Sequence, residues 1–265
     1  MKLLFQSERK SFEFLVGSIL IGLVSIFVLI GLLYTPYDPN EMNGLMKNVA
    51  PNLVHPFGTD NFGRDILSRV MEGSRNTFFI AICTVGIGVI FGTILGAFTG
   101  YFGGLLDEVL MRINDGLLSF PSILLALVFV SIVGTGKYNI ILALGILFIP
   151  SFARIVRSEF ILQKQMDYVK NAKVLGASNL RIIFIHILPN TLPILFSSIS
   201  IGLNNAILAE AGMSYLGLGV QPPDASLGRM LSEAQTYLLS APWYALAPGI
   251  MIIITVLGFS LLSEK

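Results

Sequence analysis

The sequence predicts an all-α membrane protein, a polytopic bundle of six transmembrane helices. Of its 265 residues, 54% are hydrophobic and only 12% are charged, whereas about a quarter are charged in soluble domains. Charged residues separate apolar segments whose lengths are close to the about 20 residues that a helix needs to cross about 30 Å of hydrocarbon. Glycines recur within these segments, as in GIGVIFGTILGAFTGYFGG, and favour close helix packing in lipid.

The whole chain, residues 1–265, is expected to form one transmembrane domain. A basic flank precedes the first crossing, whose apolar run is about twice the length of a signal-peptide core. We therefore expect it to remain as an N-terminal helix over 12–34, followed by a five-helix core over 75–265. The six crossings are approximately Phe14–Tyr34, Thr77–Tyr101, Gly116–Val133, Tyr138–Ala153, Leu188–Leu208 and Leu246–Leu262.

Basic residues predict the orientation. With a cytoplasmic N-terminus, about eleven Lys and Arg residues lie inside and about six outside, which follows the positive-inside rule. Both termini and the connection over 154–181 are then cytoplasmic. The near-neutral net charge of +1 argues against a nucleic-acid partner, and the single cysteine, Cys83, can build neither a disulfide nor a metal site within the chain.

In the segment DYVKNAKVLGASNLRIIFIHILPN, which begins at Asp167, charged residues reappear with a helix-like spacing. Its apolar residues Tyr168, Ala172 and Leu175 fall at i, i+4 and i+7, which predicts an amphipathic helix. Gly176 suits the position that ends it, and Ser178 or Asn179 can cap a second helix directed toward the membrane. From the pattern alone, a helix lying on lipid headgroups is an equal alternative.

Two further segments fall on the predicted outer side. HPFGTDNFGRDILSRVMEGSRNT begins at His55, where glycines give turns and Thr59 or Asp60 can cap a helix lying on the membrane. ILAEAGMSYLGLGVQPPDASLGRML begins at Ile207 and places Glu210 near the end of a crossing, where ionisable groups are costly. The glycines and prolines that follow predict a loop.

These three segments resemble the permease subunits of ATP-binding-cassette (ABC) importers for dipeptides, oligopeptides and nickel. The outer segments resemble that family's G-T-D-x-x-G-R-D and A-E-A-x-x-S-x-L-G-L-G-x-Q-P-P motifs, and residues 158–190 resemble its EAA loop. In the EAA triplet only Ala172 matches, because Lys170 and Asn171 depart from it. Gly176 and the Ile187–Leu188–Pro189 ending match the loop.

The resemblance implies site residues at both faces. In the family, the EAA loop forms a coupling helix that sits in a cleft of a cytoplasmic ATPase. The two outer segments are turn-rich and semi-apolar and fall on one side of the predicted topology, so we expect them to form a rim that contacts a solute-binding protein. The coupling residues would be Tyr168, Ala172, Leu175, Gly176, Ala177 and Ser178. The rim residues would be Asp60, Arg64, Asp65, Glu210, Gly217, Gly219 and Gln221.

The same resemblance implies a complex in a bacterial or archaeal cytoplasmic membrane. Its partners would be a second homologous permease, two cytoplasmic ABC ATPase subunits, an extracellular solute-binding lipoprotein and membrane lipid. ATP and Mg²⁺ would bind to the ATPases, so this chain would bind no cofactor or metal and would not be an enzyme. The cargo would be peptides, or alternatively nickel or a metal chelate.

Two other classes fit the sequence less well. An intramembrane hydrolase needs a nucleophile and a base within reach of each other, but GMSY at Gly212 lacks the final glycine of a G-x-S-G serine motif. The two histidines, His55 and His186, fall on opposite faces of the predicted topology. A channel or secondary transporter would carry coupling ionisable groups near the membrane midplane, where this sequence has almost none.

Overall fold

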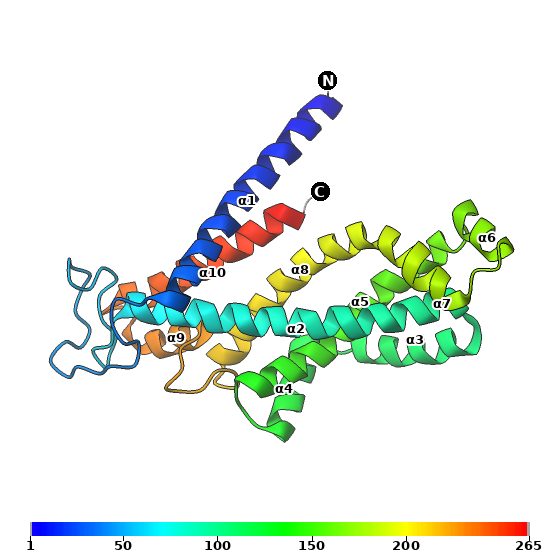
Figure 1. Cartoon of the computed structure of the whole chain (residues 1–265). Helices are drawn as coiled ribbons and strands as arrows, with labels where there is room; N and C mark the ends of the chain where they lie inside the picture. The colour runs from blue at the N-terminus through cyan, green and yellow to red at the C-terminus, as the bar shows by residue number, and fades with distance from the viewer. Residues whose placement is uncertain (1, 264–265) are drawn as a thin grey trace.

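The computed structural model describes residues 2–263, with side chains from residue 12 onward, and its regular elements there are helices (Figure 1). They are α1 (Lys2–Leu33), α2 (Ile66–Phe102), α3 (Gly104–Leu118), α4 (Ser122–Val133), α5 (Lys137–Gln163), α6 (Asp167–Val174), α7 (Asn179–Arg181), a π-helical turn (Ile182–Ile187), α8 (Leu188–Tyr215), α9 (Leu227–Ala234), a 3-10 turn (Gln235–Tyr237) and α10 (Pro242–Ser263).

Within the described residues, five helical stretches are long and apolar enough to cross a membrane, or six if α3 and α4 together form one span. A single straight crossing from Gly116 to Val133 is wrong, because α3 and α4 meet at a 90° bend. Pro121 explains the break, since it has no N–H to continue a helix and disfavours helical geometry in Phe120 before it. It becomes instead the residue that precedes α4.

The long helices extend beyond the predicted apolar segments. α2 begins at Ile66 instead of Thr77, and α5 continues to Gln163 instead of ending at Ala153. Sequence reasoning ended these segments at charges, but the charges are paired inside the fold. Arg69 lies between acidic groups in the first turns of α2, and Arg157 of α5 pairs with Asp107 of α3 at 2.5 Å.

The central helix α2 packs along α5 through glycines. Four of them recur at every fourth position and form one stripe: Gly88, Gly92, Gly96 and Gly100. A Cβ atom added to Gly96 would lie 2.5 Å from the carbonyl oxygen of Ala153, and one added to Gly100 would lie 2.7 Å from that of Arg157. The absence of side chains therefore sets the distance between the two helices, as the sequence predicted.

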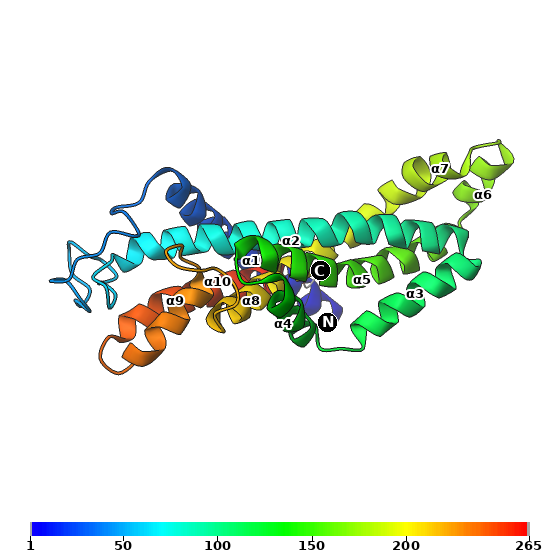
Figure 2. The ribbon, with the colours of Figure 1, turned by 90° about the horizontal axis from the view of Figure 1, so that it is seen from below.

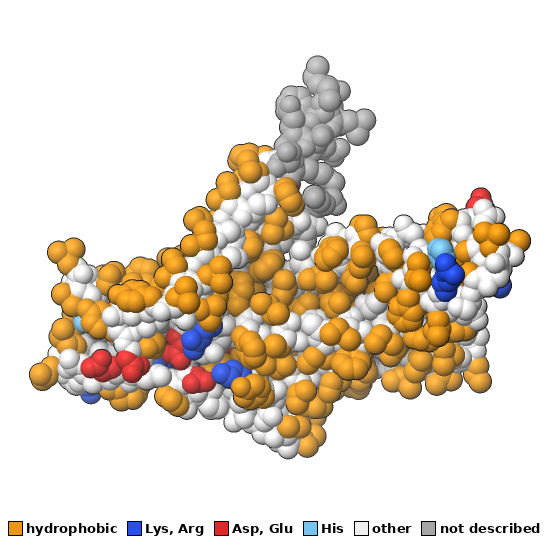
Figure 3. Space-filling view, viewed as in Figure 1, with side chains coloured by type: hydrophobic (Ala, Val, Ile, Leu, Met, Phe, Trp, Pro, Cys, Tyr) orange, Lys and Arg blue, Asp and Glu red, His pale blue; other side chains and the backbone are white. Residues whose placement is uncertain are grey.

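Helices α1 and α10 pack side by side and lean away from α2 in the view of Figure 1. Gly17 of α1 lies against Leu261, and Gly258 of α10 lies against Ile21. Much of the visible surface of these and the other long helices is apolar (Figure 3), as expected of helices that face lipid.

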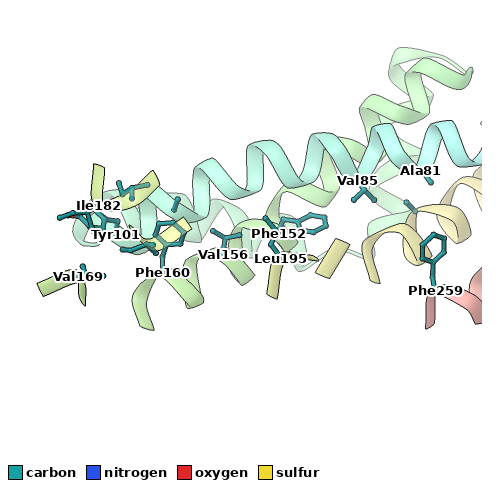
Figure 4. Packing of buried hydrophobic residues seen from close by; sticks show 14 of the residues in the cluster. Ala81, Val85, Tyr101, Phe152, Val156, Phe160, Val169, Ile182, Leu195 and Phe259 are labelled. Atoms are coloured by element: carbon teal, nitrogen blue, oxygen red, sulfur yellow. The ribbon is translucent and has the colours of Figure 1, made fainter. Parts of the chain in front are cut away.

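The two ends of the long bundle differ, and we call them the α6 end and the α9 end. At the α6 end, α6 and the turn that follows it project beyond α2 and α5, whereas the loop over 34–65 and α9 cover the start of α2 at the other end (Figures 1 and 2). A continuous apolar cluster runs along α2, α5 and α8 to α6 (Figure 4). It includes Phe152, Phe160, Tyr101, Ile182 and Val169.

Candidate functional site

The helix α6 ends in the turn that the sequence predicted. Gly176 has a φ of +81°, and its N–H donates to the carbonyl of Lys173 at 3.1 Å. The N–H of Ala177 donates to the carbonyl of Ala172 at 3.0 Å, so the two bonds form a Schellman motif. Ser178 then caps α7 by accepting the N–H of Arg181. The helix, turn and second helix are confirmed.

The apolar face of α6 differs from the predicted stripe. Ala172 faces the protein's own core together with Val169, so little of its side chain is left for a partner to contact. Tyr168 is partly exposed, and its hydroxyl donates to Gln163 at 2.8 Å. Leu175 is 86% exposed, as is Val174, which sequence reasoning missed. The physical reason is that α6 lies against the π-helical turn with its Val169 side.

The segment is firmly attached to two long helices. The Tyr101 hydroxyl at the end of α2 donates to Oδ1 of Asn179 at 2.8 Å, and Ile182 and Ile183 beyond it are fully buried. From Asn179 the helix continues through the π-helical turn into α8. Pro189, which has no N–H to donate, follows this turn, which fits the local widening of the hydrogen-bond ladder. Only the turn over 175–178 therefore separates α6 from the helical stretch that becomes α8.

At the α9 end, a network of charged side chains joins the loop over 34–65 to α9. Arg64 pairs with Asp60 at 2.6 Å and with Glu233 of α9 at 3.0 Å. Arg69 lies between the same two carboxylates, at 3.6 Å and 3.5 Å. Burial acts to lower the pKa of Arg64, but the carboxylates of Asp60 and Glu233 outweigh burial and raise this pKa above its usual value. Burial acts to raise the pKa of Glu233. This pKa is nevertheless lowered below its usual value by Arg69, the Tyr244 hydroxyl and Arg64.

Three residues predicted for the outer rim are therefore interior groups. Asp60, Arg64 and Asp65 are all buried. Asp65, instead of Thr59 or Asp60, caps the helix by accepting the N–H of Ser68 at 2.8 Å, and it also contacts His55. That helix is the start of α2 and is buried, so a separate helix lying on the membrane is wrong. The side chains fold inward because each satisfies backbone or charged groups of its own loop.

The second outer motif packs onto the first. Asn76 donates to the carbonyl of Ala225 at 2.7 Å, and Leu227 N–H donates to the Thr77 hydroxyl at 3.3 Å. Glu210 is fully buried and accepts from Ser214 at 2.6 Å. The contacts of Asn76 and Thr77 hold the predicted loop over 216–226 in place. Glu210, like the first three rim residues, has a partner inside the protein.

The remaining rim residues form the turn after α8. Gly217 has a φ of +80°, and Gly219 packs so closely on Ser214 that no side chain would fit. The side chain of Gln221 is half-buried and donates to the carbonyls of Gly217 and Gly219. Of the seven predicted rim residues, only Gly217 and Gln221 reach the surface in part, because the motif serves mainly to build the loop.

A cavity of about 550 Å³ lies in the middle of the bundle between α4, α5 and α8. Its wall is largely apolar, with the hydroxyl groups of Ser122, Ser151 and Ser198 and the amide of Asn205 among its polar groups. No charged side chain lines it among the described residues. Sequence reasoning missed this surface, although isolated polar residues inside apolar crossings were the available signal.

Comparison with known proteins decides between the possible families. A family model described as the binding-protein-dependent transport system inner membrane component matches residues 92–264. The chain belongs to this family. It is a multi-pass inner-membrane permease subunit of an ABC transporter, a transport component and not an enzyme.

Curated relatives resemble this permease over most of its length. The dipeptide transport system permease protein DppC of Haemophilus influenzae is 39% identical over 94% of this chain and 87% of its own. Its namesake in Alkalihalophilus pseudofirmus is 38% identical, over 98% and 86%. The glutathione transport system permease protein GsiD of Pectobacterium atrosepticum is 41% identical, over 86% and 76%.

A solved structure confirms the fold of this permease. A chain of the MetNI methionine ABC transporter, in an inward-facing conformation, matches with a TM-score of 0.60 over 73% of this chain and 93% of that chain. The sequence identity is 19%, so the likeness concerns the fold alone. The all-α fold class and the permease function predicted from the sequence are confirmed.

Proposed function

We propose that this permease forms half of the translocation pathway of a peptide importer and that α6 is its contact with a cytoplasmic ATPase. ATP and Mg²⁺ bind on two such ATPase subunits, a second homologous permease completes the pathway, and an extracellular solute-binding protein delivers the cargo. The single observation that carries the α6 contact is its exposed tip: Val174 and Leu175, each 86% exposed, project beyond the bundle on a fixed turn.

The physical case for docking starts from what α6 leaves uncovered. Leucine and valine at the end of a helix favour an apolar groove, and burying one such side chain contributes about 1.5–3 kcal/mol. Lys170 and Lys173 are exposed on the same helix, and they make burial of the whole of α6 in hydrocarbon costly. The attachment of α6 to α8 supports transmission of the partner's movement to the cavity wall.

Replacing Leu175 by aspartate should separate the permease from its ATPases. An unpaired carboxylate buried in the contact costs several kcal/mol, so association should weaken by at least about tenfold. Leu175 has few contacts of its own, and the variant should therefore fold and reach the membrane at normal levels. The measurement is co-purification of the ATPase subunits with the tagged permease, together with transport of a labelled dipeptide.

Leu239→Asp is the matched control, because Leu239 is an equally exposed leucine at the α9 end. It should leave co-purification unchanged. If Leu175→Asp retains the ATPases and transport as this control does, α6 rests on lipid and the proposed contact is wrong. Ala172 is unsuitable for this test, since a change there disturbs the permease's own core.

The orientation follows from the basic-residue bias, with both termini and α6 in the cytoplasm. Cysteines introduced at Leu53, an exposed site in the loop over 34–65, and at Lys173 should separate the two faces. In a Cys83→Ala background, an impermeant maleimide should label Leu53→Cys in intact cells and Lys173→Cys only after permeabilisation. The reverse labelling pattern would invert the proposed topology.

The peptide cargo rests on the relatives and on the chemistry of the cavity. Two relatives are dipeptide permeases and one is a glutathione permease, so their named cargoes are short peptides. Hydroxyl and amide groups in an apolar wall suit the uncharged backbone of such a cargo. Among the described residues, no group of three or more His, Cys, Asp or Glu side chains is placed to hold a metal ion.

A further inference from the structure

A smaller cavity, separate from the transport features above, lies where the last turn of α1 meets α2. Its volume is about 230 Å³. Residues 31–35 and Pro39 line one side, and Glu72 and Arg75 of α2 line the other. The site is at the end of α1 and near the start of α2, two helices that are long and apolar enough to cross a membrane. The ends of such helices fall near the level where hydrocarbon gives way to the lipid headgroups.

Glu72 is the unusual group in this cavity. The residue is only 8% exposed, and its Oε2 is buried without a hydrogen-bond partner among the described residues. Buried carboxylates are normally paired, since burial removes the water that would otherwise solvate the charge. The nearby Arg69 makes no hydrogen bond or ion pair with Glu72, because it lies between Asp60 and Glu233; its charge acts on the Glu72 carboxylate only from a distance, as does that of Arg75. The carboxylate thus offers an open position for a cation that donates hydrogen bonds.

Arg75 supplies the opposite charge. It is half-buried, lines the same cavity and makes no hydrogen bond or ion pair with any described residue. It lies three residues after Glu72, so both side chains project from one face of α2. The end of α1 adds a third feature, since the carbonyls of a helix's last turn carry partial negative charge and favour a cation. The cavity therefore presents an anionic part and a cationic part side by side.

The surroundings indicate which zwitterion can reach this cavity. Leu32 and Leu33 on the last turn of α1 are exposed, and Leu33 is 91% exposed. Figure 3 shows acidic and basic side chains gathered near the start of α2 and bordered by apolar surface. A lipid could lay its chains along this apolar surface while its headgroup enters the cavity.

We propose that this cavity binds the headgroup of a zwitterionic phospholipid with a primary ammonium group, such as phosphatidylethanolamine. The ammonium donates hydrogen bonds to Glu72 and to the carbonyls at the end of α1, and the phosphate accepts from Arg75. Phosphatidylcholine satisfies this site poorly because its quaternary ammonium has no N–H to donate. Phosphatidylglycerol has no cation for Glu72.

The test is lipid binding to the purified full-length chain, delipidated in detergent and measured by native mass spectrometry. Dioleoyl phosphatidylethanolamine should bind about tenfold more tightly than the choline or glycerol lipid with the same chains, the difference expected for one charge-assisted hydrogen bond. Glu72→Gln should remove this preference, and Arg75→Gln should weaken binding of the ethanolamine lipid. Glu108→Gln and Arg112→Gln are the controls, because these residues form an exposed pair elsewhere on the chain and should change nothing.

Each other outcome overturns the proposal. Equal binding of the three lipids by the wild-type chain rejects headgroup recognition without any variant, so the test stands even if Glu72→Gln does not fold. An unchanged lipid preference in Glu72→Gln and Arg75→Gln would place the lipid elsewhere. Displacement of the ethanolamine lipid by dialanine, but not by glycerophosphoethanolamine, would assign the cavity to a soluble peptide instead.

Discussion

Replacing Gly96 by leucine should prevent the permease from reaching its folded state. The first added carbon would lie 2.5 Å from the Ala153 carbonyl and 2.9 Å from both the Arg157 nitrogen and the Val156 Cβ. Overpacking in soluble cores costs about 1–3 kcal/mol when side chains can move aside. Here two of the three contacts are backbone, so α2 and α5 would have to separate, and apolar lipid supplies little force to hold displaced helices together.

The measurement is the yield of monodisperse protein after detergent extraction, followed by the thermal midpoint of any protein recovered. Gly86→Leu is a matched control on the same helix, because a Cβ atom there meets nothing within 4 Å. The control should be recovered in normal amounts. Recovery of Gly96→Leu with the stability of this control would mean that α2 and α5 are not packed through the glycine stripe.

Replacing Arg69 by methionine should destabilise the α9 end. The guanidinium is fully buried between Asp60 and Glu233 and also donates to the carbonyl of Pro39 at 3.2 Å. Its removal would leave the buried carboxylate of Asp60 with Arg64 as its one remaining cation, while Glu233 would keep Arg64, Arg229 and Tyr244. Breaking a buried arrangement of charges costs about 3–5 kcal/mol. A lower thermal midpoint in detergent and faster proteolysis within residues 34–65 should report the loss.

Arg229→Met provides the comparison for Arg69. Arg229 also pairs with Glu233, at 3.1 Å, but its side chain is 23% exposed, and surface pairs contribute about 0–1 kcal/mol. Its replacement should therefore lower the thermal midpoint far less. Equal effects of the two variants would show that burial of Arg69 does not set the strength of the network.

The fold could be predicted where composition and helix-ending signals act locally. Apolar length located the long helices, and Gly176 and Ser178 determined the turn after α6 because their effects depend on a few neighbouring residues. The 90° break between α3 and α4 was missed, since the apolar segment continues across Pro121. The true ends of α2 and α5 were missed because Arg69 and Arg157 stay inside helices only when distant partners neutralise them.

The candidate sites were harder to predict, because burial depends on tertiary contacts. In a short helix, apolar residues spaced three or four apart can be found on more than one face. In α6 the face with Val169 and Ala172 is the buried one, because it packs in the same cluster as Ile182. Motif matching found Asp60 and Asp65 but not the direction of their side chains. Glu233 is far from them in sequence, so the network that it completes could not be seen before the chain was folded.

The turn that ends α6 has a consequence for how a partner would meet it. Ordering a residue from a flexible chain costs about 1–2 kcal/mol of conformational entropy, and a segment of eight residues rarely forms a stable helix by itself. In this chain α6 is already held by the Schellman motif and by burial of Val169 and Ala172. A binding partner therefore meets a preorganised surface, and two exposed aliphatic side chains can contribute nearly all of their transfer free energy to association.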